Sequence, residues 1–207
     1  MEAQLHSPLA PSVEYRPRSG IAPASRTDAE LIELIAAADN QAMRTLVTRH
    51  NVRVFRYVLR LVSDRTLAED VVSDVFFEVW RQAHKFESRS KVSTWILAIA
   101  RNKAMSFLRC RHVHANLDQS VDIIDPTENA EATWHRVNRN KSLRECLMKL
   151  SPSHREVLDL VYYHEEPTES VAKIIGIPLN TVKTRLFHAR KHLAVLLAEA
   201  GINCAAP

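Results

Sequence analysis

The sequence predicts an all-α protein made of two small helical domains joined by a flexible acidic linker, and three observations support this prediction. Glycine, which tight turns between strands often require, occurs only three times in 207 residues. Apolar residues recur at steps of three and four, the spacing that places side chains on one side of a helix. Residue types that cap helices stand directly before several of these periodic stretches.

The first block, residues 26–112, is expected to hold four helices around one core. Thr27 and Glu30 form a capping box, because the threonine oxygen can accept an amide of the first turn while the glutamate reaches back. The helix they open runs through about Ala37. Asp39 or Asn40 then caps a longer helix that ends near residues 63 and 64.

The rest of the first block repeats this pattern. Thr66 and Glu69 form another capping box, which opens a helix in LAEDVVSDVFFEVWRQA. After the polar loop KFESRSKVS, a last helix is expected from about Thr94 to Arg111. The residues of that helix expected to face the core are Trp95, Ile96, Ile99, Ala100, Met105 and Leu108.

The second block, residues 138–200, contains the spacing of a helix-turn-helix. Ser151 is expected to cap a helix that has proline at its first position, where the missing N–H costs nothing. Further on, Gly176 ends a short helix in a left-handed turn and another helix starts near Leu179. Ala172, four residues before the glycine, and Val182, six residues after it, complete the pattern.

The helix after this turn lies in PLNTVKTRLFHARKHLAVLL and has a cationic face opposite an apolar stripe, with no acid from Pro178 to Leu197. Such a helix suits a DNA major groove, where base edges and phosphates accept hydrogen bonds. Phe187 has two interpretations, contact with a thymine methyl or sugars, or packing in the core. The residues expected to contact DNA are Asn180, Lys183, Thr184, Arg185, Phe187, His188, Arg190 and Lys191.

The whole pattern resembles the extracytoplasmic-function (ECF) group of bacterial sigma-70 family RNA polymerase sigma factors. The resemblance rests on LAEDVVSDVFFEVW, STWILAIARNKAMSFLR and GIPLNTVKTRLFHARKHL, and it covers residues 28–112 and 138–198 with their flanks. It implies sigma domain 2, a four-helix bundle, at residues 26–112 and sigma domain 4 at residues 138–200. It also implies a factor that binds core RNA polymerase, directs it to a promoter and opens the DNA without catalysis of its own.

The resemblance implies roles for particular residues. In this family, the helix in LAEDVVSDVFFEVW grips the clamp of the largest polymerase subunit, and the second subunit contributes its flap. The implied clamp contacts are Asp70, Asp74, Phe77 and Glu78, in which the acids form a row along one face beside the phenylalanine. The other face of the same helix is expected to pack in the core.

The loop KFESRSKVS and the helix after it are similar to the part of the family that binds the minus-ten element. Opening a promoter requires a base to be unstacked and held, which calls for polar loop groups, aromatic surface and phosphate-binding cations. Core packing is favoured for Trp95. The implied minus-ten contacts are Phe86, Ser88, Arg89, Ser90, Lys91, Ser93, Thr94, Arg101, Asn102 and Lys103.

Residues 1–25 are expected to form a disordered tail, and residues 113–137 an acidic linker. The linker is either a solvated spacer or, as the family implies, a strand that stands in for RNA in the polymerase. The family also implies an anti-sigma factor that masks the protein until a stress signal arrives.

The segment HEEPTESVAKIIG departs from the usual family pattern. Pro167 stands at the usual capping position, and Thr168 is expected to take over the capping role. Glu165 and Glu166 place negative charge near the turn, which argues against close phosphate contact by the first helix of the motif.

Other functional classes lack support in the sequence. Three cysteines without a CxxC, no apolar run of ~20 residues and no signal peptide favour a cytoplasmic protein without membrane insertion. No cofactor or metal is expected, because Cys110, His112 and His114 point in different directions on a helix. No HExxH or GxSxG motif supports an enzyme. A dimeric helix-turn-helix regulator remains the alternative.

Overall fold

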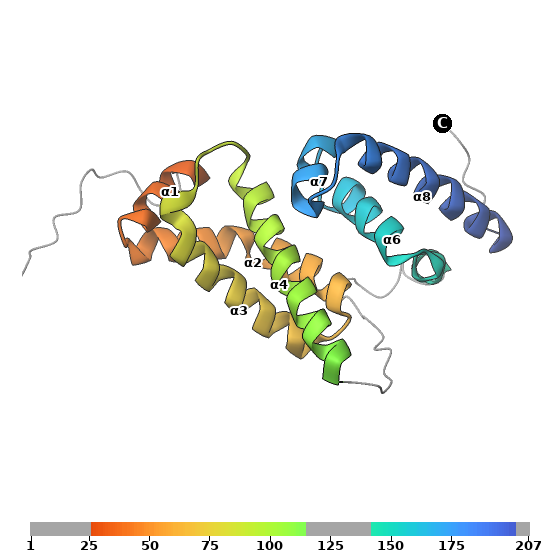
Figure 1. Cartoon of the computed structure of the whole chain (residues 1–207), viewed down its shortest axis with the longest axis horizontal. Helices are drawn as coiled ribbons and strands as arrows, with labels where there is room; N and C mark the ends of the chain where they lie inside the picture. The colour runs from red at the N-terminus through yellow and green to blue at the C-terminus, as the bar shows by residue number, and fades with distance from the viewer. Residues whose placement is uncertain (1–25, 115–141, 202–207) are drawn as a thin grey trace, which may run out of the picture.

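The computed structural model describes residues 26–114 and 142–201, and within these ranges it contains helices and turns but no strand. The first block forms one helical bundle and the second block forms a smaller one beside it (Figure 1). The two blocks meet where helix α4 of the first packs against helix α7 of the second (Figure 1). The predicted all-α fold with two domains is therefore confirmed.

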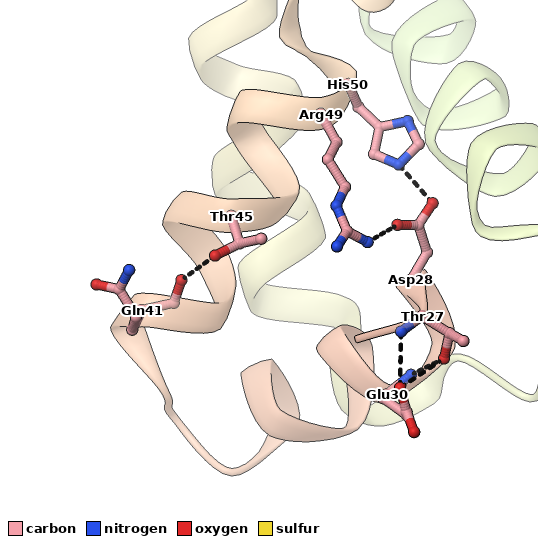
Figure 2. A network of polar contacts seen from close by, with 7 residues as sticks. All are labelled: Thr27, Asp28, Glu30, Gln41, Thr45, Arg49 and His50. Carbon is pink, nitrogen blue, oxygen red and sulfur yellow. Dashed lines mark hydrogen bonds and ion pairs between the residues drawn. The ribbon is translucent and has the colours of Figure 1, made fainter. Parts of the chain in front are cut away.

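Helices α1 (Asp28–Ala36) and α2 (Asn40–Val62) begin with the predicted caps. The Thr27 backbone N–H donates to Glu30 Oε2 at 2.7 Å, and the Glu30 N–H donates to Thr27 Oγ1 at 3.3 Å (Figure 2). The Asp39 carboxylate accepts the backbone N–H groups of residues 41 and 42. Local side chains thus fix both helix starts before any distant packing is considered.

Asp28 ties α1 to the middle of α2. Its carboxylate lies 2.8 Å from Arg49 Nη1 and 2.7 Å from His50 Nε2 (Figure 2). Burial raises the pKa of Asp28, but the hydrogen bond from Arg49 and the charge of His50 outweigh it, so the pKa is lowered overall. This contact holds the amino end of α1 against the bundle.

Helix α3 (Arg65–Gln82) begins two residues before the predicted start at Leu67 and continues into the short helix η2 (Ala83–Lys85). The predicted capping box of Thr66 and Glu69 is wrong. Asp64 is the cap, since its carboxylate accepts the Leu67 N–H at 3.0 Å. Aspartate is as good a cap as threonine and comes first along the chain, so the helix already includes residue 66.

Helix α4 (Val92–His114) completes the first bundle, and α2, α3 and α4 pack against one another. It starts two residues before the predicted start at Thr94 and, at its other end, extends two residues into the predicted linker. Trp95 is half-buried, and its ring lies 5.0 Å from that of Phe86. The largest fully buried side chains of this bundle are Tyr57, Leu31, Ile32, Leu46, Ile96 and Leu97.

The second block contains a helix at residues 142–149, then α6 (Pro152–Leu158), the π-helical turn η3 (Asp159–Tyr163), α7 (Thr168–Ile175) and α8 (Leu179–Glu199). Ser151 caps α6 as predicted, by accepting the His154 N–H. The predicted takeover of capping by Thr168 is wrong, because Pro167 is the cap position of α7 and makes no side-chain cap bond.

The predicted tail at residues 1–25 and the predicted linker beyond residue 114 lie outside the described residues. No helix in the described ranges is both long enough and apolar enough to cross a membrane.

Candidate nucleic-acid interface

The helix-turn-helix is formed by α7, the turn at Gly176, and α8. Gly176 has a φ of +74°, in the left-handed region that glycine adopts without strain, and its N–H donates to the Ala172 carbonyl at 2.9 Å. A Cβ added at this position would meet no atom within 4 Å, so glycine serves the backbone angle and not a close approach. Val182 is fully buried and fixes α8 against the rest of the block.

Helix α8 buries one side and exposes the other, as predicted. Val182, Leu186, Ala189 and Leu197 are buried. Arg185 is half-buried, whereas the other predicted contacts with DNA are all exposed, namely Asn180, Lys183, Thr184, Phe187, His188, Arg190 and Lys191. The structure therefore brings the predicted residues onto one solvent-facing helix that starts directly after the turn.

Phe187 lies on this exposed face with 63 % of its surface accessible, which rules out core packing in this conformation. Its ring makes an edge contact with His188, with centroids 5.4 Å apart. Nearby, the Arg190 guanidinium lies over the ring of Tyr162 at 5.4 Å. Aromatic and cationic groups thus alternate on this surface, a combination that suits bases and phosphates.

His154 lies in α6 and faces the cations of α8. Its pKa is lowered, first by burial and then by the charges of His192, Arg185 and His188. The same charges of α8 that disfavour protonation of His154 would attract an anionic ligand to this end of the second block.

The loop between η2 and α4 lines a surface cavity of about 390 Å³. The cavity is lined by Phe86, Ser88, Ser90, Lys91 and Ser93, all predicted minus-ten contacts, and also by Asp28 and Ala29 of α1. Arg89 does not line it. The Arg89 side chain is exposed and forms an ion pair with Glu87 at 2.6 Å.

Three predicted minus-ten contacts are already engaged within the chain. Thr94 is 1 % exposed and its hydroxyl lies 3.2 Å from Glu166 Oε2. Arg101 Nε donates to Glu156 Oε1 at 2.7 Å. Lys103 Nζ lies 3.2 Å from Glu78 Oε2. In this conformation these three side chains are therefore not free to contact DNA, although the prediction requires this. Asn102 is exposed, so its side chain is accessible to DNA.

The predicted clamp surface on α3 is only partly present. Asp70 is exposed, Asp74 is half-buried, and Phe77 has 65 % of its surface accessible. Glu78 departs from the expected acidic row, because its buried carboxylate accepts hydrogen bonds from Arg81 and Gln82.

These hydrogen bonds to Glu78 from Arg81 and Gln82, with a further contribution from Lys103, lower its pKa to about 2. Glu78 therefore stabilises the bundle from within, and the exposed surface consists of Asp70, Asp74 and Phe77.

Sequence reasoning missed the polar residues where the two blocks meet. Arg53, Tyr57 and Arg60 follow one another at steps of four and three on α2, a spacing that could have indicated a second contact face. The residues of the second block that these side chains contact directly are Glu156, Asp159, His164 and Glu166.

Comparison with known families assigns both blocks. A family model described as Sigma-70 region 2 matches residues 46–113, and one described as Sigma-70, region 4 matches residues 140–193. The ECF RNA polymerase sigma factor SigL of Mycobacterium tuberculosis (strain H37Rv) is 30 % identical over 172 residues, covering 81 % of this chain and 96 % of SigL. The chain belongs to the ECF group of the sigma-70 family.

Other sigma factors are also similar. SigK of Mycobacterium bovis (strain BCG / Pasteur 1173P2) is 27 % identical over 79 % of this chain and 89 % of its own length. CnrH, solved in complex with the cytosolic domain of CnrY, matches with a TM-score of 0.62 at 23 % identity, covering 83 % of this chain and 97 % of CnrH.

RpoE from Bartonella quintana, solved with the anti-sigma factor NepR, gives a TM-score of 0.62 at 24 % identity, over 75 % of this chain and 96 % of its own. These two structures support the fold, and membership of the sigma family makes this chain a DNA-binding regulator of transcription.

Proposed function

We propose that this ECF sigma factor binds core RNA polymerase, recognises minus-thirty-five and minus-ten promoter elements and opens the promoter, with no catalysis of its own. Helix α8 would enter the major groove at the minus-thirty-five element. The loop and cavity before α4 would hold an unstacked base of the minus-ten element. The observation that carries this proposal is the exposed cationic face of α8, directly after a helix-turn-helix turn, in a chain that also matches Sigma-70 region 2.

The polymerase contact is proposed to lie on α3. Phe77 offers an exposed aromatic ring one turn beyond the carboxylates of Asp70 and Asp74 on the same helix, which is a suitable surface for a basic coiled coil. We propose the clamp of the largest subunit as the ligand of this surface and the flap of the second subunit as a contact of the second block.

An anti-sigma factor is proposed as the regulatory partner, and a stress-responsive gene set as the target. Support comes from the similar structures, since RpoE was solved with the anti-sigma factor NepR and CnrH with a domain of CnrY. A protein with these partners would act in the bacterial cytoplasm, where polymerase and promoter DNA are found.

The division of labour between the blocks can be tested with Phe77→Ser. The side chain is largely exposed, so its loss should leave folding intact while weakening the affinity for core polymerase by tenfold or more, the effect of a typical interface anchor. Val52→Ser is the matched control, because Val52 is also exposed in the first block but lies on α2.

Affinity for core polymerase would be measured by fluorescence anisotropy, with circular dichroism to check folding. Equal affinities of the Phe77→Ser and Val52→Ser variants would contradict the proposed polymerase surface. A chain that instead binds palindromic DNA as a dimer, without polymerase, would support the alternative of a conventional regulator.

A further inference from the structure

We propose that the two blocks form a closed, self-inhibited state in which acidic side chains of the second block occupy Arg101 and Thr94, two groups of the first block that promoter DNA would use. This proposal rests on the proposed function, because the minus-ten surface belongs to it. The polar contacts that cross between the blocks are called the latch. Its pairs are Tyr57 and Arg101 with Glu156, Arg53 with Glu166 and the carbonyl of His164, Thr94 with Glu166 and Ser170, Arg60 with Asp159, and Lys173 with the carbonyl of Arg89.

The first part of the latch surrounds Glu156 of α6. The Tyr57 hydroxyl, fully buried in the first block, donates to Glu156 Oε1 at 3.0 Å. Arg101 of α4 donates to the same oxygen at 2.7 Å and approaches Oε2 at 3.4 Å. Burial raises the pKa of Tyr57 well above its usual value, and the negative charge of Glu156 raises it further. The tyrosine therefore remains a donor to Glu156.

The second part of the latch surrounds Glu166, just before α7. Its side chain is 3 % exposed and accepts hydrogen bonds from Arg53 at 2.8 Å and from Thr94 at 3.2 Å. Arg53 also donates to the backbone carbonyl of His164. Lys173 of α7 donates to the Arg89 carbonyl at 2.9 Å, so the second block also reaches the loop beside the cavity.

The signs of the charges are segregated across this contact. The paired cations Arg53, Arg60 and Arg101 belong to α2 and α4, whereas the paired acids belong to the second block and are Glu156, Asp159 and Glu166. A carboxylate and a phosphate offer the same kind of oxygen acceptor to a guanidinium. Promoter phosphates and the second block would therefore compete for Arg101.

The latch is built to be reversible. The Arg53, Arg60 and Arg101 side chains keep 35 %, 31 % and 21 % of their surface accessible, so water screens each ion pair and limits the stability that it contributes. In addition, Arg53 Nε is buried with no hydrogen-bond partner among the described residues, as is His164 Nε2, which lies 3.5 Å from an Asp159 oxygen. Unsatisfied groups of this kind weaken the closed state and favour exchange with a better partner.

The test uses the full chain labelled for single-molecule energy transfer at Ser73 of α3 and Ala194 of α8, two exposed positions in different blocks, with other accessible thiols replaced. In the chain with the unmodified latch, the distance between the two labels should be short and its distribution narrow. Arg53→Glu opposes Glu166 with a like charge and should lower the ratio of closed to open molecules by about tenfold or more. Arg53→Glu combined with Glu166→Arg should restore part of the closed population.

Arg65→Glu is the matched control. It reverses an arginine of the same block whose partner, Glu69, lies on the same helix, so the closed population should not change. Affinity for an unpaired minus-ten oligonucleotide should rise in the Arg53→Glu variant, since neither residue of that pair is a proposed DNA contact.

Two results would overturn the closed state. One is a broad distribution of long distances between the labels in the unmodified chain, and the other is a closed population that Arg53→Glu leaves unchanged. Opening without a gain in DNA affinity would overturn self-inhibition. Failure of the proposed function would show separately, as absent transcription with core polymerase, because the distance does not depend on DNA.

Discussion

Substitution of Lys183 should change DNA recognition without changing folding or polymerase binding. Its side chain is exposed on α8, next to the buried Val182, and it makes no ion pair or hydrogen bond with other described residues. Lys183→Ala should therefore change the free energy of unfolding by less than about 0.5 kcal/mol. A base-edge contact is worth ~1–3 kcal/mol, so holoenzyme affinity for a cognate promoter should fall about 5- to 150-fold.

Three measurements resolve this prediction for Lys183→Ala. Promoter affinity is followed by anisotropy at several salt concentrations, core polymerase affinity by the same method, and stability by thermal unfolding. A phosphate contact, rather than a base contact, would appear as a salt slope reduced by about 1 across all sequences. Lys149→Ala, at an exposed lysine outside α8, is the control. Lost polymerase binding by Lys183→Ala would refute the assignment of α8 to DNA.

Three further outcomes follow from the structure. Gly176→Ala should destabilise the second block by about 1 kcal/mol in thermal unfolding, because the strain is confined to φ and no atom opposes the new Cβ; a loss above ~3 kcal/mol would contradict this. The stabilisation that the ionised Glu78 contributes to the folded state should be fully present above a pH of 4.5, the usual pKa of glutamate, and should be lost as the pH falls towards about 2. When the stability of the Glu78→Gln variant is measured as a function of pH, this loss at acid pH should be absent. Thr27→Ala should lower the free energy of unfolding by ~1 kcal/mol in urea, because it removes the cap of α1. Thr48→Ala is the control and should leave this free energy unchanged, since the Thr48 hydroxyl bonds only within α2.

Features determined by nearby residues could be predicted from the sequence. The capping box at Thr27, the caps at Asp39 and Ser151, and the left-handed turn at Gly176 all depend on side chains within three or four positions. The two wrong caps arose where several capping residues stand close together. Asp64 precedes Thr66 and caps first, and Pro167 fixes the start of α7 before Thr168.

Features determined by distant contacts could not be predicted. Helical periodicity places Glu78 on the same face as Asp70 and Asp74, but only the packed bundle brings Lys103 to it from α4. Likewise, Thr94 is a polar residue next to a polar loop, and its burial depends on Glu166, which lies 72 residues further along the chain. A charged residue at an interface between blocks looks the same in sequence as one exposed to water.

The central claim, that this chain directs polymerase to promoters, is tested most directly by run-off transcription. Purified core polymerase would transcribe a pool of fragments from the source genome with and without the protein. Discrete new transcripts that share two spaced upstream elements are the predicted result. No new transcripts from an active core polymerase, together with dimeric binding to DNA, would contradict the claim.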